Sequence, residues 1–210
     1  MAQAESPERC ITHYSISNKI LLVGEGDFSF GACLARAFGS AKNITATSLD
    51  PIGAVMKYND ARDNLGKLLE LGCHIIHGVD ALYMRRHPAL RTHKFDRIVF
   101  NFPHGGFQYR EDDQRQITLH QDVVSGFLKS ARKMLTEEGQ VHLTHKTTAP
   151  FNLWCVNSLA KKCRLRLVKK RTFIRSDYPG YNNKRGAGVD FDKSFPIGQC
   201  KTFVFTKLTS

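Results

Sequence analysis

The order of apolar segments along the chain limits its fold more than any other feature. Short continuous apolar runs, typical of buried strands, alternate with segments whose apolar residues recur at helical spacing. Strands are expected at 19–23, 44–49, 74–79, 95–101 and 140–145, with helices from Asp27 or Ser29 to a stop at Gly39, near 60–71, and over 114–135 before a stop at Gly139. Alternating strands and helices predict an α/β fold with a mostly parallel, doubly wound sheet.

The last part of the chain follows a different pattern. Residues 164–173 and 200–206 each favour a strand, and we expect these two C-terminal strands to be antiparallel. Residues 174–198 between them show no apolar period. A loop of that length within a compact domain is usually functional or disordered.

The length of 210 residues is enough for one α/β domain with a sizeable core. We expect this single domain over 19–208, with 151–208 as its basic part and 1–18 as a flexible N-terminal segment. That segment lacks the apolar stretch of a signal peptide. The longest aliphatic run, ILLV, is far shorter than the roughly 20 residues of a membrane helix. A soluble intracellular protein is expected.

Six cysteines and nine histidines are scattered along the chain. The cysteines include no Cys-X-X-Cys pair and no zinc-finger spacing, and several lie in apolar stretches, where cysteine behaves as a small hydrophobic residue. We therefore expect reduced thiols and no metal site.

Positive charge is concentrated near the C-terminus. Residues 1–150 hold 18 Lys/Arg against 16 Asp/Glu, whereas residues 151–210 hold 13 against 3. This asymmetry favours a polyanionic partner, nucleic acid before membrane because no amphipathic anchor accompanies it. The alternative is a solvated surface that only aids solubility.

The stretch ILLVGEGDFSFG places two glycines, Gly24 and Gly26, directly after the first expected strand. Ligands of parallel sheets bind at the carboxyl ends of the strands, and glycines there allow backbone N–H groups to approach a ligand closely. A dinucleotide fingerprint would need a third glycine where this chain has Ser29, and no phosphate-loop lysine follows. An ordinary tight strand–helix turn is the alternative.

Two acids follow the next strands. Asp50 is placed to accept both hydroxyls of a ribose, and Asp80 to accept from an adenine amino group. Either acid alone fits a helix N-cap equally well. Together with the glycine turn they favour an adenosine-bearing cofactor.

The fourth strand ends in NFPHGG, where Asn101 follows a buried apolar run. A polar amide at such a place needs a partner, and the proline lets nearby carbonyls face a planar ligand. Loops of this kind occur in methyltransferases that modify ring or exocyclic nitrogens. The alternative is a turn that merely ends the strand.

Five motifs in this order together resemble one family: VGEGDFSF, GVDA, NFPHGG, GQVHLTHKT and YPGYNNKRGAG. The chain is similar to the large-subunit (25S-type) rRNA uridine-N(3) methyltransferases, in a plant-like version with the Rossmann-like domain alone. The resemblance implies a class I methyltransferase fold, S-adenosyl-L-methionine as cofactor, rRNA methylation, and a nuclear, nucleolar setting, with the cytoplasm as alternative. The cofactor-binding residues expected are Gly24, Glu25, Gly26, Asp27, Phe28, Asp50, Asp80 and Asn101. Because Leu22 replaces a common acid, Asp27 or backbone carbonyls are left for the cofactor's amino group.

Methyl transfer to an imide nitrogen needs alignment of the two reactants and removal of a proton. We expect Asn101 and His104 to act on the acceptor base, with His104 as the general base and Lys146 as the cation that stabilises charge on the pyrimidine oxygens. The alternatives are a structural loop histidine and a surface lysine.

RNA contacts are expected in the basic part of the chain. The long loop combines stacking surfaces with phosphate-binding cations, and the strand before it adds a basic stripe. The residues concerned are Tyr178, Tyr181, Lys184, Arg185, Lys169, Lys170 and Arg171. A solvated strand face is the alternative for the stripe.

Two other function classes stay open. A nicotinamide-dependent oxidoreductase would use the same acids, although the missing third glycine disfavours it. A non-catalytic RNA-binding relative with the same fold would have much the same sequence. The sequence leaves the target nucleotide and the oligomeric state open.

Overall fold

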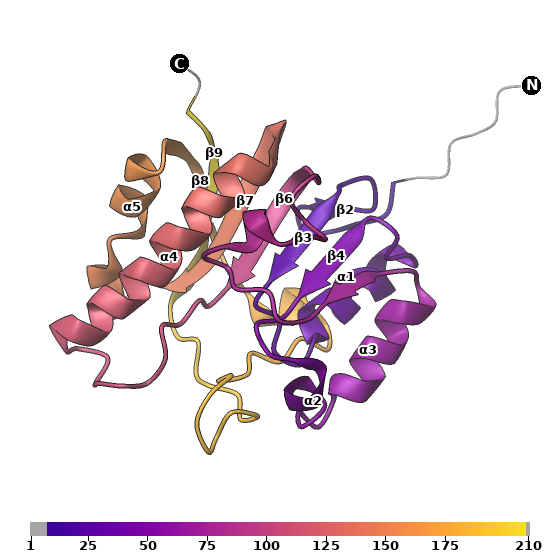
Figure 1. Cartoon of the computed structure of the whole chain (residues 1–210), viewed down its shortest axis with the longest axis horizontal. Coiled ribbons are helices and arrows are strands. Elements are labelled where there is room, and N and C mark those ends of the chain that lie inside the picture. Colours follow the sequence, from indigo (N-terminus) through magenta and orange to yellow (C-terminus); the bar gives the residue numbers. More distant parts are fainter. Residues whose placement is uncertain (1–7, 209–210) are drawn as a thin grey trace, which may run out of the picture.

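The computed structural model describes residues 8–208, and a seven-stranded sheet runs through its middle (Figure 1). The strand order is β5–β4–β3–β6–β7–β9–β8. The strands are β3 (Ile20–Val23), β4 (Ile44–Thr47), β5 (His74–Ile76), β6 (Phe95–Asn101), β7 (Leu135–Lys146), β8 (Leu165–Thr172) and β9 (Cys200–Lys207). All pairs from β5 to β7 are parallel, and β9 is antiparallel to both β7 and β8. The predicted α/β fold with antiparallel C-terminal strands is confirmed.

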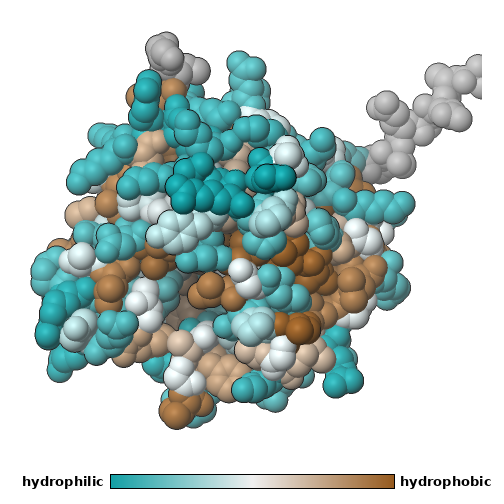
Figure 2. Space-filling model, viewed as in Figure 1, coloured by the Kyte–Doolittle hydropathy of each residue, from teal (hydrophilic) through white to brown (hydrophobic). Residues whose placement is uncertain are grey.

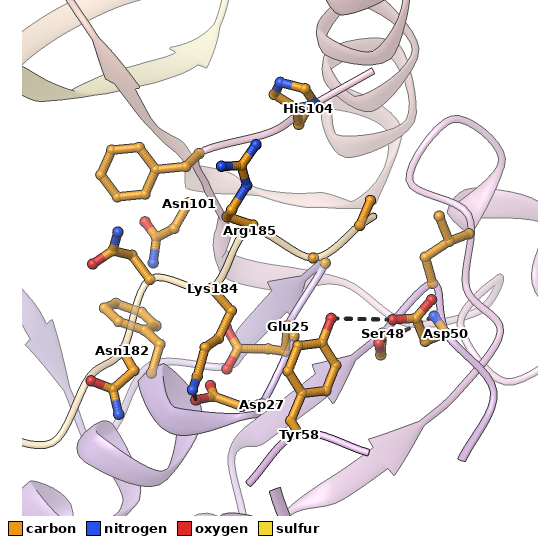
Figure 3. A pocket seen from close by; sticks show the side chains of 18 of the residues that line it. Glu25, Asp27, Ser48, Asp50, Tyr58, Asn101, His104, Asn182, Lys184 and Arg185 are labelled. Carbon is orange, nitrogen blue, oxygen red and sulfur yellow. Dashed lines mark hydrogen bonds and ion pairs between the residues drawn. The ribbon is translucent and has the colours of Figure 1, made fainter. Parts of the chain in front are cut away.

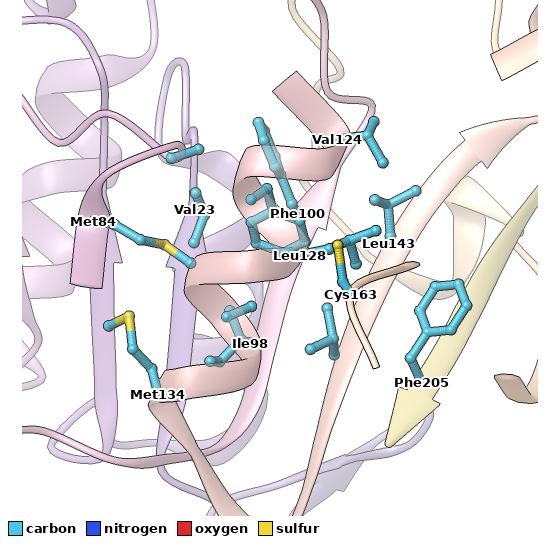
Figure 4. Packing of buried hydrophobic residues seen from close by; sticks show 14 of the residues in the cluster. Val23, Met84, Ile98, Phe100, Val124, Leu128, Met134, Leu143, Cys163 and Phe205 are labelled. Carbon is cyan, nitrogen blue, oxygen red and sulfur yellow. The ribbon is translucent and has the colours of Figure 1, made fainter. Parts of the chain in front are cut away.

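Helices cover both faces of the sheet. One face is packed by α4 (Gln114–Met134) and α5 (Val156–Lys162), and the other by α1 (Ser29–Phe38), α2 (Ile52–Val55) and α3 (Ala61–Glu70). Strand β3 is buried throughout because its side chains alternate between the two hydrophobic clusters. On the α4 face, Val23 and Phe100 pack against Leu128 of the helix (Figure 4).

Two expected helix boundaries need correction. Helix α1 begins at Ser29, and its N-cap residue is Phe28, with a left-handed φ of 60°, rather than Asp27 or Ser29. The Asp27 carboxylate nevertheless accepts the Ser29 N–H at 3.0 Å. The predicted stop at Gly39 is confirmed by its left-handed φ of 68°. Gly139 does not stop α4, because the chain enters β7 at Leu135. A Cβ on Gly139 would lie 2.9 Å from the Phe95 carbonyl oxygen, so glycine serves close strand packing there.

The N-terminal segment is folded over its described part. Strands β1 (Cys10–Ile11) and β2 (Tyr14–Ser15) form an antiparallel hairpin. Tyr14 is buried, and its hydroxyl lies 3.1 Å from Nδ1 of His142 on β7. Residues 8–18 thus include a folded hairpin where a flexible segment over 1–18 was expected, while residues 1–7 lie outside the described residues.

The sheet topology determines where a ligand can bind. The chain winds from β3 towards β5 on one side and resumes at β6 on the other, so the switch point lies between β3 and β6. Ligands of doubly wound sheets bind at the carboxyl ends of such strands. Within residues 8–208, no helix combines the length and apolarity that a bilayer crossing requires.

Candidate functional site

A cavity of about 280 Å³ opens at the carboxyl ends of β3, β4 and β6 (Figure 3). The glycine turn 23–27, residues 48–50 and residues 100–102 line it from the sheet. Residues 181–187 of the long loop, which we name the strap, complete its lining together with residues from other loops. The space-filling view shows hydrophobic side chains at the edge of a hollow, with hydrophilic ones over much of the surrounding face (Figure 2). The predicted location of the ligand site at the switch point agrees with this cavity.

Gly24 makes the turn possible. Its φ is 69°, and a Cβ there would lie 2.5 Å from the Phe100 ring, so a side chain is excluded on both counts. The next residue, Glu25, is fixed by its backbone N–H, which donates to the Thr47 carbonyl at 2.8 Å. Any ligand in the cavity therefore meets backbone at this turn.

Two buried carboxyl groups follow. Glu25 accepts the Gly31 N–H at 3.0 Å, and burial raises its pKa to about 8. Burial also raises the pKa of Asp27, against the hydrogen bonds from Ser29. The Oδ2 atom of Asp27 is buried without a hydrogen-bond partner among residues 8–208. Both acids line the cavity, as predicted for cofactor-binding residues.

The two strand-end acids behave differently. Asp50 lines the cavity and lies on the same side as Tyr58, whose hydroxyl is 3.5 Å from the Asp50 carboxylate. Asp80 is not among the lining residues, and its Oδ1 atom accepts the Leu82 N–H at 2.8 Å and caps a turn. Phe28 is absent from the lining too, since its ring is buried in the α1-side core. The structure therefore does not place Asp80 and Phe28 among the residues that line the cavity, unlike the other residues predicted to bind the cofactor.

Asn101 ends β6 and faces the same cavity. Its Oδ1 atom is buried with no hydrogen-bond partner among the described residues. Unsatisfied buried polar atoms are rare without a ligand or water. Together with Asp27 Oδ2 and the bare backbone at Gly24, this atom makes the cavity a good fit for S-adenosylmethionine, which carries amino, carboxylate, ribose and adenine groups.

The strap is tied to the glycine turn. Asn182 N–H donates to the Ser29 hydroxyl at 2.9 Å. Lys184, whose side chain is only 9% exposed, lies 2.7 Å from the Asp192 carboxylate and 3.9 Å from those of Asp27 and Asp60. Lys184 thus closes the cavity wall, and the prediction that it contacts RNA phosphates is corrected.

Of the two tyrosines of the long loop, Tyr178 is a core residue and Tyr181 is partly buried. Tyr178 is 4% exposed and stacks on Phe173 at a centroid distance of 5.3 Å. Tyr181 packs edge-on against Phe30, 5.3 Å between centroids, and lines the cavity. The ring of Tyr178 is therefore not free to stack on an RNA base, which corrects that prediction, whereas an RNA contact of Tyr181 stays a prediction. Arg185 is exposed, and its guanidinium lies 5.1 Å from the Phe107 ring.

A second cavity of about 210 Å³ adjoins the first. Phe102, His104, Phe107, Lys184, Arg185 and Phe195 line both. The second cavity alone is lined by Pro103, Glu111, His145, Lys146, Phe151 and Trp154. The predicted catalytic residues are thus brought together, with Asn101 on the first cavity, Lys146 on the second and His104 on both.

Lys146 lies among aromatic rings. Its Nζ atom is 4.6 Å from the Phe151 centroid and 5.0 Å from that of Phe195. Burial lowers its pKa, while the charge of Glu111 raises it. The Lys146 ammonium group, held beside these two phenylalanine rings, could therefore face a deprotonated pyrimidine ring bound in the same cavity.

Two residues beside His104 were missed from the sequence. Nε2 of His104 lies 2.8 Å from Oε1 of Glu111, and Nε2 of His120 lies 3.1 Å from Oε2 of the same carboxylate. Their ligand atoms lie within 4.8 Å of one another. Glu111 lies in a loop and His120 lies inside α4, so their spacing in the sequence does not indicate that they meet. The sequence offered one signal for Glu111, an acid seven residues after the candidate base His104.

The basic stripe on β8 divides between the two sheet faces. Lys169 and Arg171 pair with Val204 and Thr202, whereas Lys170 pairs with Phe203 and lies 5.3 Å from its ring. Mainly burial, and then the charges of Arg171, Arg97 and Lys169, lower the pKa of His13 to about 4. Arg97 therefore belongs to the same positive region as Lys169 and Arg171, on the face that carries the N-terminal hairpin.

Comparison with known proteins agrees with this geometry. Residues 21–185 match the family described as BMT5-like, rRNA (uridine-N3-)-methyltransferase. An uncharacterized protein of Arabidopsis thaliana is 51% identical over 97% of this chain and 99% of its own length. Heavy metal-associated isoprenylated plant protein 41 of the same plant is 49% identical over 93% of the chain, which spans only 38% of that relative. The 25S rRNA (uridine(2634)-N(3))-methyltransferase of Saccharomyces cerevisiae is 24% identical over 91% of this chain and 73% of its own.

Solved structures share the fold. A ribosomal protein L11 methylase from Lactobacillus delbrueckii superposes with a TM-score of 0.54 at 11% identity, covering 91% of this chain and 71% of its own. The N-methyltransferase NodS of Bradyrhizobium japonicum, in complex with S-adenosyl-L-homocysteine, gives 0.51 at 15% identity over 90% and 78%. The family match confirms the predicted methyltransferase class, and the solved structures confirm the predicted Rossmann-like fold. The chain belongs to the BMT5-like rRNA (uridine-N3-)-methyltransferase family.

Proposed function

We propose that the protein methylates N3 of a uridine in large-subunit rRNA. The observation that supports this most is the pair of adjoining cavities that meet at His104. One cavity presents the polar groups that an adenosine-bearing donor needs, and the other combines aromatic rings with charged and histidine side chains. His104 lines both cavities, which supports a role for it where donor and acceptor would meet.

The donor side uses the glycine turn and its neighbours. Gly24, Gly26 and Asp50 would hold the nucleoside, while Asp27 and Asn101 have the unpaired buried oxygens that can accept from the cofactor. S-adenosylmethionine, when bound, supplies an electrophilic methyl group on a sulfonium. The strap would then shield the methyl group from water through Lys184.

The acceptor side is suited to a base that has left its stack. A base within an RNA helix must be unpaired before its ring nitrogen is reached, and aromatic surfaces stabilise that state. The rings of Phe102, Phe107 and Trp154 line the second cavity. His104 would remove the N3 proton, and Lys146 would face the negative charge left on the pyrimidine oxygens.

We expect the remaining RNA contacts at the edge of the cavities and beyond them. Arg185 is exposed beside both cavities, and Lys169, Arg171 and Arg97 form a positive region on the sheet. These groups suit phosphate contacts, which position the substrate without reading its sequence. An rRNA substrate is consistent with a nuclear, specifically nucleolar, location, which we propose as well.

The proposal is tested by nucleoside analysis. Unmodified large-subunit rRNA is incubated with the purified protein and S-adenosylmethionine, digested, and examined by mass spectrometry for N3-methyluridine. His104→Ala should lose the product while S-adenosylmethionine affinity, measured by calorimetry, stays within a few-fold of wild type. Tight RNA binding without any methylated nucleoside would support the alternative, a non-catalytic RNA-binding protein.

A further inference from the structure

His120 has one ring nitrogen whose proton state is fixed by the backbone. The Gly105 N–H donates to its Nδ1 at 2.9 Å, so Nδ1 must carry a lone pair and the proton must be on Nε2. Two groups lie near that Nε2: the Glu111 carboxylate at 3.1 Å and the Gln116 amide nitrogen at 3.2 Å. The amide nitrogen has no lone pair to accept with and donates to the Gly106 carbonyl. Glu111 is therefore the acceptor of the His120 proton.

The same carboxylate fixes the second histidine. Glu111 Oε1 lies 2.8 Å from Nε2 of His104. Partial burial raises the pKa of Glu111, but hydrogen bonds from His104 and His120 outweigh it and lower that pKa to about 2. An ionised carboxylate only accepts, so His104 must donate from Nε2. Its lone pair is then on Nδ1, which is buried and has no hydrogen-bond partner within residues 8–208.

The ring of His104 is also held and kept neutral. It stacks on Phe107 with a centroid distance of 4.0 Å. Burial lowers the pKa of His104, and the nearby His120 and Arg185 lower it further, against the effect of Glu111. At neutral pH the ring is therefore an unprotonated imidazole with a fixed donor and a fixed acceptor.

A metal ion is the other chemistry that two histidines and a glutamate suggest. Binding through Nε2 of His120 would require that nitrogen to lose its proton. Because Nδ1 already accepts from Gly105, the ring would then have to be an imidazolate or give up that backbone bond. The hydrogen-bond pattern favours a proton arrangement over a metal site.

We propose that Glu111 is a positioning residue that sets the tautomer of His104, so that Nδ1 is the atom that removes the N3 proton of the acceptor uracil. The inference deepens the proposed function and rests on it. The N3 proton would pass to Nδ1 while N3 forms a bond to the methyl carbon. The bond between that carbon and the sulfur would break, and its electron pair would stay on the sulfur. Glu111 balances the positive charge that His104 gains, and the proton later leaves to solvent.

Glu111→Gln tests this sharply, because a glutamine side chain offers one acceptor and one donor. The Nε2–H of His120 would donate its hydrogen bond to the amide oxygen of Gln at position 111, and the amide NH₂ group would then face His104. His104 must then accept at Nε2 and carry its proton on Nδ1. Long-range ¹H–¹⁵N spectra of ¹⁵N-histidine-labelled protein should show Nε2–H for His104 in wild type and Nδ1–H in the variant, with His120 unchanged. His104→Gln assigns the signals.

Kinetics provide the second readout. Single-turnover methyl transfer to rRNA should fall by about 10²- to 10⁴-fold in Glu111→Gln, the usual contribution of a general base, with S-adenosylmethionine affinity unchanged. Glu111→Asp keeps an acceptor for both rings and should retain the Nε2–H tautomer and part of the rate. Asp112→Asn, the loss of an exposed acid next in the chain, is the matched control and should match wild type.

Two results would overturn the inference. One is an unchanged His104 tautomer in Glu111→Gln, and the other is a rate within about threefold of wild type despite a reversed tautomer. The spectra need no RNA, so they decide the role of Glu111 even where wild type methylates no rRNA, a result that would instead refute the proposed function.

Discussion

At the scale of single residues, burial decides what a charged side chain does. Lys184 stands in a basic, glycine-rich loop, and such a pattern is typical of phosphate contacts. In the structure its side chain is enclosed and paired with Asp192, near Asp27. A cation in that place holds the strap to the glycine turn, a role that local sequence does not reveal.

Replacing Lys184 should therefore weaken cofactor binding. In Lys184→Ala the carboxylates of Asp27 and Asp192 lose their cation, and the strap loses its tie. Loss of a charged hydrogen bond costs about 1.5–3 kcal/mol, which corresponds to about 10- to 100-fold in S-adenosylmethionine affinity by calorimetry. Lys193→Ala, in the same loop but exposed and paired with Asp190, is the control. Equal affinities in both variants would remove the strap from the cofactor site.

The two strand-end acids offer a matched pair. Asp50→Ala should lower S-adenosylmethionine affinity by about 10- to 100-fold because Asp50 lines the cavity. Asp80→Ala should leave affinity unchanged and instead lower the free energy of unfolding by about 0.5–2 kcal/mol, since Asp80 caps a turn. Calorimetry and urea unfolding measure the two effects. A loss of affinity in Asp80→Ala would restore the original assignment from the sequence.

At the scale of elements, strands and helices with a regular apolar period could be predicted from the sequence, whereas elements held by tertiary contacts could not. Strand β6 and helix α4 lie where their apolar periods predict them, within one residue. The hairpin β1–β2 was missed because two-residue strands carry no period and are held by contacts such as that of Tyr14 with His142. The glycine turn and NFPH loop were found because their residues adjoin strands. The Glu111–His120 contact was not, because it joins a loop to the inside of a helix.

The docking of the hairpin can be tested through one hydroxyl. Tyr14→Phe removes the partner of His142 Nδ1 in a fully buried setting. An unsatisfied buried acceptor costs about 1–3 kcal/mol, so the free energy of unfolding should fall by that amount. Tyr83→Phe, which removes an exposed hydroxyl, should change it by less than about 0.5 kcal/mol. Similar unfolding curves for both variants would show that the hairpin contributes little to the fold.

At the scale of the whole molecule, the excess positive charge of the last 60 residues is divided by the fold. Part of it lies beside the cavities, as in Arg185, and part on the sheet face that Lys169 and Arg171 share with Arg97. Lys170 points to the other face, over Phe203. A charge count alone does not distinguish these places, because a strand sends alternate residues to opposite faces.

This division predicts unequal effects on RNA binding. Each phosphate contact that is lost should flatten the dependence of log affinity on log salt by about 0.7–0.9. Lys169→Ala and Arg171→Ala together should therefore lower the slope by about 1.4–1.8. Lys170→Ala, on the same strand and the opposite face, should leave it unchanged. RNA affinity across a salt series measures both, and equal slopes would place the RNA elsewhere.

The most direct test of the central claim is single-turnover transfer of a labelled methyl group from S-adenosylmethionine to unmodified large-subunit rRNA, followed by nucleoside analysis. With wild type, the label should be found in N3-methyluridine. In His104→Ala the rate should be lower by about 10²-fold or more at nearly unchanged cofactor affinity. Label in a different nucleoside, or an undiminished rate in His104→Ala, would contradict the proposed function.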